Sequence, residues 1–185
     1  MIPGVRRALA VAAVLTMALP SLADAQTKRR VKKDEQASPP PASVDKRDRT
    51  VNAPGSPFNG RAYWQAAATC GGIYFKLRTM YSDAAVRAKV VKPDPAAFAS
   101  LSKDADRATR GATMFFEAAE RFLISDRKVA RDEAVITYDA VASASGDRVK
   151  TIDAAVQAAK PCPELYNVCR GAFPQTCNDN TVLTN

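Results

Sequence analysis

The chain contains no histidine among its 185 residues. Without histidine it cannot build a Ser-His-Asp or Cys-His nucleophilic site, a histidine-ligated haem or the usual histidine-rich metal site. It also lacks a Cys-x2-Cys pair, the spacing typical of zinc sites and of thiol redox motifs. These absences remove the common catalytic options. We therefore expect a protein that is not an enzyme and that needs no cofactor.

Long apolar runs are also missing, apart from a short one near the start of the chain. Residues 8–19 form this run, Arg6 and Arg7 precede it, and residues 23–25 supply a small-x-small cleavage pattern. A membrane-spanning helix needs roughly 20 apolar residues, so the run is too short to be an anchor. The pattern predicts a secretory signal peptide over residues 1–25. We expect the mature chain to be periplasmic or secreted, with no transmembrane anchor.

Large apolar residues are scarce over residues 26–58. This segment is rich in proline and contains the basic run from Lys28 to Lys33. Such a composition buries too little apolar surface to offset the entropy lost on ordering, so we expect a disordered linker. The basic run suits an anionic envelope surface, whereas the acidic residues that dilute it favour a plain solvated linker. No nucleic-acid motif is present, and an exported chain is not expected to bind nucleic acid.

From residue 59 onward, apolar residues recur at spacings of three and four, which predicts amphipathic helices. Pro93 ends the first helix, and Pro161 ends the third. Candidate N-caps are Asn59, Asp94 and Ser125. The predicted helices cover about 60–92, 95–123 and 126–160, followed by a short helix over about 163–171, and there is no strand pattern.

The short connections between these helices force neighbouring helices to run antiparallel. The sequence therefore predicts an all-α fold. We expect an up-down-up antiparallel three-helix bundle with a short disulfide-stapled helical segment at its C-terminus. This bundle domain should cover residues 59–177, and residues 178–185 should form a flexible tail.

The four cysteines are an even number in a chain expected to be exported, which favours two disulfide bonds. Cys70 lies in the first predicted helix and the other three lie near the C-terminus, so at least one bond must join these two regions. Of the three pairings we prefer Cys70–Cys169 with Cys162–Cys177. The alternative is a zinc site of four thiolates, which the missing Cys-x2-Cys spacing disfavours.

The start of the first predicted helix is apolar beyond its main face. Trp64 and Phe75 lie off that face, among small residues that permit close approach of another segment. The simpler interpretation is a second buried face, covered by the C-terminal segment that contains Tyr166. The alternative is a pocket for a small apolar ligand near Trp64 and Cys70, lined by Trp64, Phe75 and Tyr166.

Several short motifs of residues 61–177 carry a resemblance to known proteins. They are Tyr63-Trp64 before Cys70-Gly71-Gly72, the run from Phe115 to Phe122, and Pro161-Cys162-Pro163 ahead of Cys169 and Cys177. With the predicted signal peptide, this pattern resembles small exported helical proteins of alphaproteobacteria. The resemblance implies a periplasmic location, and it implies no activity and no functional residues.

Two functions from different classes follow from these observations. The first is a non-catalytic interaction or structural module of the cell envelope, which binds a protein partner or an anionic envelope surface through its basic run. The second is a carrier for a small apolar ligand, with its pocket near Trp64 and Cys70.

Overall fold

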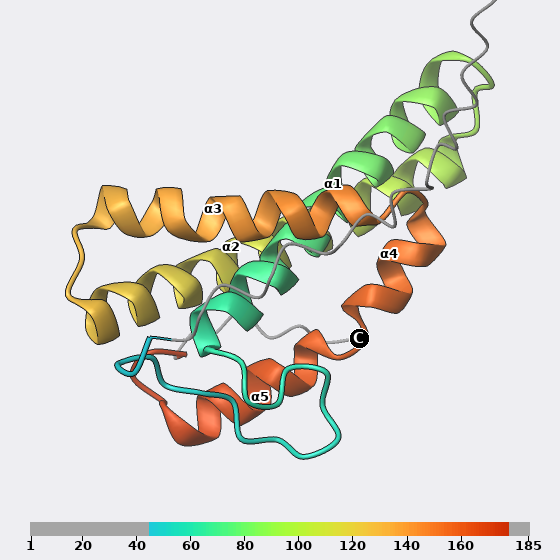
Figure 1. Cartoon of the computed structure of the whole chain (residues 1–185). Helices are drawn as coiled ribbons and strands as arrows, with labels where there is room; N and C mark the ends of the chain where they lie inside the picture. Colours follow the sequence, from blue (N-terminus) through green and yellow to red (C-terminus); the bar gives the residue numbers. More distant parts are fainter. Residues whose placement is uncertain (1–44, 178–185) are drawn as a thin grey trace, which may run out of the picture. The chain divides into compact units, whose positions relative to one another are not determined.

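Five helices follow one another over residues 45–177, the part of the chain that the computed structural model describes. No β-strand occurs among these residues, so the prediction of a helical fold is confirmed for them (Figure 1). The predicted signal peptide, the basic run and the C-terminal tail lie outside the described residues. The helices are α1 (Tyr63–Val90), α2 (Pro95–Arg127), α3 (Arg131–Arg148), α4 (Ile152–Ala159) and α5 (Cys162–Ala172).

Helices α1 and α2 form a helical hairpin with the most extensive contact between any two of these helices. The hairpin turn follows the sequence signals. The carboxylate of Asp94 accepts a hydrogen bond from the Ala97 N–H at 3.0 Å, and Pro95 is the first residue of α2. Between the helices, Tyr74 stacks on Phe115 with ring centroids 5.7 Å apart. The predicted cap and the predicted start of the second helix are confirmed.

The predicted cap at Asn59 is wrong. Helix α1 begins four residues later, at Tyr63, and its N-cap residue Ala62 has no side-chain cap. Asn59 instead lies in a loop, where its side-chain oxygen accepts a hydrogen bond from the Ala53 N–H at 3.0 Å. The residue type suited a cap, but the loop before α1 uses that side chain to close a turn.

The predicted cap at Ser125 is also wrong, because α2 continues through this residue to Arg127. The hydroxyl of Ser125 donates to the carbonyl oxygen of Phe122 at 3.2 Å, a bond within the helix. The helix ends at Lys128, which has a left-handed backbone with a φ of 59°. The start of α3 then has no side-chain cap.

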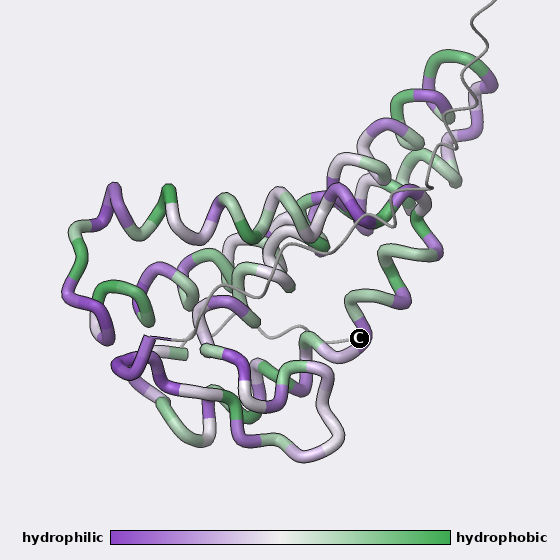
Figure 2. The backbone as a smooth tube through the Cα atoms, in the orientation of Figure 1, coloured by the Kyte–Doolittle hydropathy of each residue, from purple (hydrophilic) through white to green (hydrophobic). Residues whose placement is uncertain are grey.

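The third predicted helix is divided into α3 and α4. The break lies after Arg148, and the hydroxyl of Thr151 caps α4 by accepting a hydrogen bond from the Ala154 N–H at 3.2 Å. The sequence Ser-Ala-Ser-Gly at residues 143–146 has no large apolar side chain and so favours a kink there, yet these residues are helical, with Ser145 and Gly146 buried where α3 meets α1. Figure 2 shows hydrophobic and hydrophilic residues interspersed along these helices.

A close backbone contact joins α1 to α3. A Cβ atom placed on Gly72 would lie 2.6 Å from the carbonyl carbon of Ala142, which is closer than real Cβ atoms approach backbone. A Cβ atom on Gly146 would lie 3.0 Å from the carbonyl oxygen of Gly72. The two helices can therefore approach this closely only because both positions lack a side chain.

Residues 45–58 are part of the folded domain, so the predicted linker boundary at residue 58 is wrong. Val51 and Phe58 are 2% and 3% exposed, and both belong to the main apolar cluster. The Val51 N–H donates to the carbonyl oxygen of Arg61 at 2.8 Å, beside a short antiparallel bridge between Thr50 and Ala62. The average composition of this segment predicted disorder because an average does not reflect the positions of its two buried apolar residues, Val51 and Phe58.

Candidate functional site

Two disulfide bonds hold the C-terminal helix. Cys70 of α1 is bonded to Cys162 at the start of α5, and their Cα atoms are 5.8 Å apart. Cys169 is bonded to Cys177, with Cα atoms 6.0 Å apart. The preferred pairing of Cys70–Cys169 with Cys162–Cys177 is therefore wrong. The expectation that one bond joins the C-terminal segment to the first helix is confirmed.

The course of the chain around α5 explains the pairing. Helix α4 leads directly into the start of α5, which brings Cys162 against α1, whereas Cys169 lies about 10 Å further along α5 at ~1.5 Å per residue. After α5 the chain turns back, and the Phe173 N–H donates to the carbonyl oxygen of Cys169 at 2.7 Å. This turn brings Cys177 beside Cys169. All four cysteines are bonded, so none remains as a thiolate for the zinc alternative.

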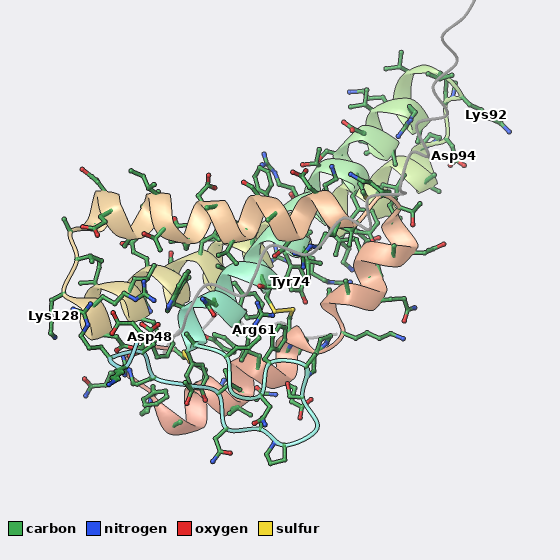
Figure 3. The ribbon with its side chains drawn as sticks, viewed as in Figure 1. Asp48, Arg61, Tyr74, Lys92, Asp94 and Lys128 are labelled. Carbon is green, nitrogen blue, oxygen red and sulfur yellow. A yellow bond between two sulfur atoms is a disulfide. The ribbon has the colours of Figure 1, made fainter. Side chains whose placement is uncertain are left out.

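Trp64 belongs to a buried polar group that we call the Asp48 cluster, which consists of Asp48, Trp64 and Arg127. Trp64 is 2% exposed, and its indole N–H donates to the Asp48 carboxylate at 3.2 Å. Arg127 donates two hydrogen bonds to the same carboxylate, at 2.8 and 2.6 Å, and its guanidinium lies 4.9 Å from the centre of the Trp64 ring. Figure 3 shows Asp48 near Lys128 at the end of α2. The cluster fastens residues 45–58 to both long helices.

The Asp48 side chain has no exposed surface. Burial alone would raise the pKa of this carboxyl, but the hydrogen bonds from Arg127 and Trp64 outweigh burial and lower the pKa below 3.8. The carboxylate therefore stays ionised in the folded protein near neutral pH.

Replacing Asp48 by asparagine is expected to lower the free energy of unfolding by about 2 kcal/mol near neutral pH, because Arg127 loses a buried charged partner. The pKa of Asp48 is lower in the folded protein than its unfolded value of roughly 3.9. Asp48 therefore contributes its full stabilisation of the fold above about pH 3.9. It is lost as the pH falls through the folded pKa. The difference between wild type and variant should therefore shrink on acidification, in urea unfolding followed by Trp64 fluorescence.

The exposed Asp106 offers a matched control, since Asp106→Asn makes the same chemical change on the surface of α2. This control should change the stability by less than about 0.5 kcal/mol at every pH. A difference between wild type and Asp48→Asn that stays constant on acidification would contradict the role given to the Asp48 carboxylate.

Tyr166 is also used in packing. It is 7% exposed, its hydroxyl donates to the carbonyl oxygen of Cys177 at 2.9 Å, and its ring meets Phe115 edge to face with centroids 6.1 Å apart. The cavity beside Tyr166 and Cys169 has a volume of about 10 Å³. That is room for about one water molecule, so this space does not hold a ligand.

Phe75 lies apart from Trp64 and Tyr166. It is 49% exposed on α1 and stands at a groove of about 370 Å³ between α1 and α3. The structure therefore does not bring the three predicted lining residues together in one pocket. We call this feature the α1–α3 groove; its apolar and small lining residues are Gly72, Phe75, Phe116, Ala142 and Gly146.

The glycine contact between α1 and α3 lies at this groove, because Gly72, Ala142 and Gly146 are among its lining residues. Phe116 of α2 forms part of the lining while stacking on Tyr138 at 5.5 Å between centroids. Lys76, Asp139 and Asp147 supply the charged part of the lining. Sequence reasoning missed the contribution of α3. The signal for it was the run of small residues at 142–146, which permits close approach of another helix.

Two glutamates of α2 could in principle act as catalytic or metal-binding carboxylates, but each is paired with an arginine. Glu117 lies 3.2 Å from Arg121, and Glu120 lies 2.9 Å from Arg131. Within residues 45–177, no three His, Cys, Asp or Glu side chains are grouped closely enough to share a metal ion. In the same part of the chain, none of the helices has the length and apolar character needed to cross a membrane.

Comparisons with protein families, with curated proteins and with solved structures found no match to this chain.

Proposed function

We propose that this protein is a non-catalytic interaction module of the cell envelope, exported by residues 1–25, and that its folded domain binds a partner at the α1–α3 groove. The exposure of Phe75 carries the proposal. An aromatic side chain that is 49% exposed beside a groove of about 370 Å³ offers a partner a concave apolar contact. Protein interfaces typically have an apolar centre that is surrounded by a polar or charged rim.

The remainder of the domain suits a scaffold. We further infer that α1, α2 and α3 act as one antiparallel up-down-up unit that holds the groove in a constant shape. The glycine contact between Gly72 and Ala142 and the stacking of Phe116 on Tyr138 support this inference, because both lie at the groove and both join different helices. A preformed groove loses little conformational entropy when a partner binds.

Phe75→Asp is expected to weaken partner binding by about 30-fold, because a charge then occupies the apolar contact of the groove. The tagged chain is used to capture proteins from a periplasmic extract, and the affinity of the recovered partner is then measured against both proteins. Since Phe75 is half-exposed, the free energy of unfolding should change by less than about 1 kcal/mol.

Val156→Asp is the matched control for this experiment. Val156 is an apolar residue of α4 that is 38% exposed and does not line the groove. The same substitution there should leave capture unchanged. Equal capture by wild type and Phe75→Asp would exclude the groove as the contact surface.

The volume of the groove favours one alternative function. Pockets for small molecules have volumes of roughly 300–1,000 Å³, so the groove has the size that the cavity beside Tyr166 and Cys169 lacks. If the protein is a carrier, a neutral naphthalene fluorophore should bind to wild type and to Val156→Asp but not to Phe75→Asp. A fluorophore that binds none of the three proteins would exclude the carrier.

A further inference from the structure

The far end of the α1–α2 hairpin carries a second surface, separate from the α1–α3 groove. We call residues 84–103 the hairpin tip. In Figure 1 this end extends past α3 and α4, and in Figure 3 it is marked by Lys92 and Asp94. Val86, Val90 and Val91 of the tip are 59%, 69% and 77% exposed. None of the helices that the structure describes therefore covers these side chains.

The exposed valines lie on the outer side of α1. Val86 and Val90 are four residues apart, so they lie one above the other on one face of the helix. The neighbouring Ala85 is 4% exposed and so marks the buried side of α1. Val91 follows directly as the C-cap residue. Val86 and Val90 therefore form one small apolar patch near the end of the hairpin, and Val91 lies beside it, about 100° further around the helix axis.

Basic residues flank this patch on both sides. At about 100° per residue, Arg87 lies on one side of the Val86–Val90 face and Lys89 lies on the other. Lys92 follows Val91 at the end of the patch. Residues 84–103 contain four basic residues and one acidic residue, a net charge of +3. Within residues 45–177, neither Arg87 nor Lys92 forms an ion pair.

We propose that the hairpin tip binds the surface of a bilayer that contains anionic phospholipids. Exposed aliphatic side chains with basic residues on both flanks fit the boundary between head groups and acyl chains, where lipid phosphates meet the basic side chains. The charge complementarity favours a phospholipid surface over an apolar protein groove, which would leave these cations facing apolar surface. This inference relies on the envelope location in the proposed function and does not rely on the α1–α3 groove.

Vesicle cosedimentation tests the inference with residues 26–185, which include all of the described residues 45–177. Wild type should bind mixed phosphatidylglycerol and phosphatidylcholine vesicles and should not bind vesicles of phosphatidylcholine alone. Reversing two basic residues of the tip, as Arg87→Glu with Lys92→Glu, should lower the partition coefficient by about 25-fold or more. The basic run that begins at Lys28 is present in every protein compared.

The matched control is Lys150→Glu with Lys160→Glu. It changes the net charge by the same amount at two exposed positions that flank α4, away from the tip. This control should lower the partition coefficient by less than about threefold, through the change in net charge alone. A second variant, Val90→Ser with Val91→Ser, keeps every charge and should still lower the partition coefficient by about tenfold.

Three results would each overturn the inference. They are equal losses in the two charge-reversal variants, equal binding to both kinds of vesicle, and no binding of wild type to the anionic vesicles. Circular dichroism confirms that each variant keeps its helices. The assay contains no protein partner, so failure here would leave the groove proposal standing. Failure of the capture experiment with Phe75→Asp would equally leave this result unaffected.

Discussion

Replacing Cys70 and Cys162 together by alanine is expected to lower the free energy of unfolding by about 4–5 kcal/mol, because their bond closes a long loop in the unfolded chain. The two residues are 92 positions apart, and both are fully buried. Domains of ordinary stability unfold with about 5–15 kcal/mol, so this variant should lose between a third and nearly all of such a stability. Urea unfolding followed by circular dichroism measures the loss.

The second disulfide is the matched control, because Cys169→Ala with Cys177→Ala removes the same atoms from the C-terminal segment. These residues are 8 positions apart, so the loop is short and the loss should be about 2–3 kcal/mol. The order of the two losses is the test. Equal losses, or a larger loss for the short loop, would contradict the account in which the bond between α1 and α5 stabilises the fold.

Peptide mapping of the unreduced protein checks the pairing itself. Trypsin with Glu-C cuts between Cys162 and Cys169, after Glu164, and so separates the two pairings. The structure predicts that peptide 62–76 is linked to 151–164 and that peptide 165–170 is linked to 171–185. A link between 62–76 and 165–170 would instead restore the pairing of Cys70 with Cys169.

The substitution Gly72→Ala is expected to lower the free energy of unfolding by about 3 kcal/mol, at the upper end of the range for added methyl groups. The new methyl group would meet the backbone of Ala142, which cannot rotate away as a flexible side chain can. Helix α3 would have to move, and the α1–α3 groove would change with it. Thermal and urea unfolding both measure the effect.

Gly171→Ala provides the control within a helix. Gly171 lies in α5, and a Cβ atom there would have nothing within 4 Å. Because alanine is the better helix former, this variant should equal or exceed wild type in stability, by up to about 1 kcal/mol. If Gly72→Ala behaved in the same way, α3 would not pack against α1 through this contact.

Local signals in the sequence succeeded only where the tertiary structure agreed with them. Asp94 caps a helix because the hairpin turn before Pro95 needs only neighbouring residues. Asn59 and Ser125 are equally good cap residues, yet neither caps a helix. Near Asn59, the burial of Phe58 draws the chain into a loop that delays α1. At Ser125, α2 simply continues.

In the candidate site, too, the sequence predicted some features and only the tertiary structure decided others. The apolar character of Trp64, Phe75 and Tyr166 was readable from the sequence, and so was the choice between packing and a pocket. The structure assigns Trp64 and Tyr166 to packing and leaves Phe75 exposed. The packing of Trp64 depends on Asp48, whose hydrogen bonds to Trp64 and Arg127 join residues 16 and 79 positions apart in the chain. Helical periodicity contains no information about such distant partners.

The sequence by itself determined the helical class, the turn at Asp94 and Pro95, and the need for a disulfide bond between the C-terminal segment and the first helix. These features depend on residues close together in the chain or on simple counting. Only the tertiary structure decided which cysteines pair, that residues 45–58 pack, and where the groove and the hairpin tip lie. Those features depend on distances between residues far apart in the chain, which are set when the helices pack.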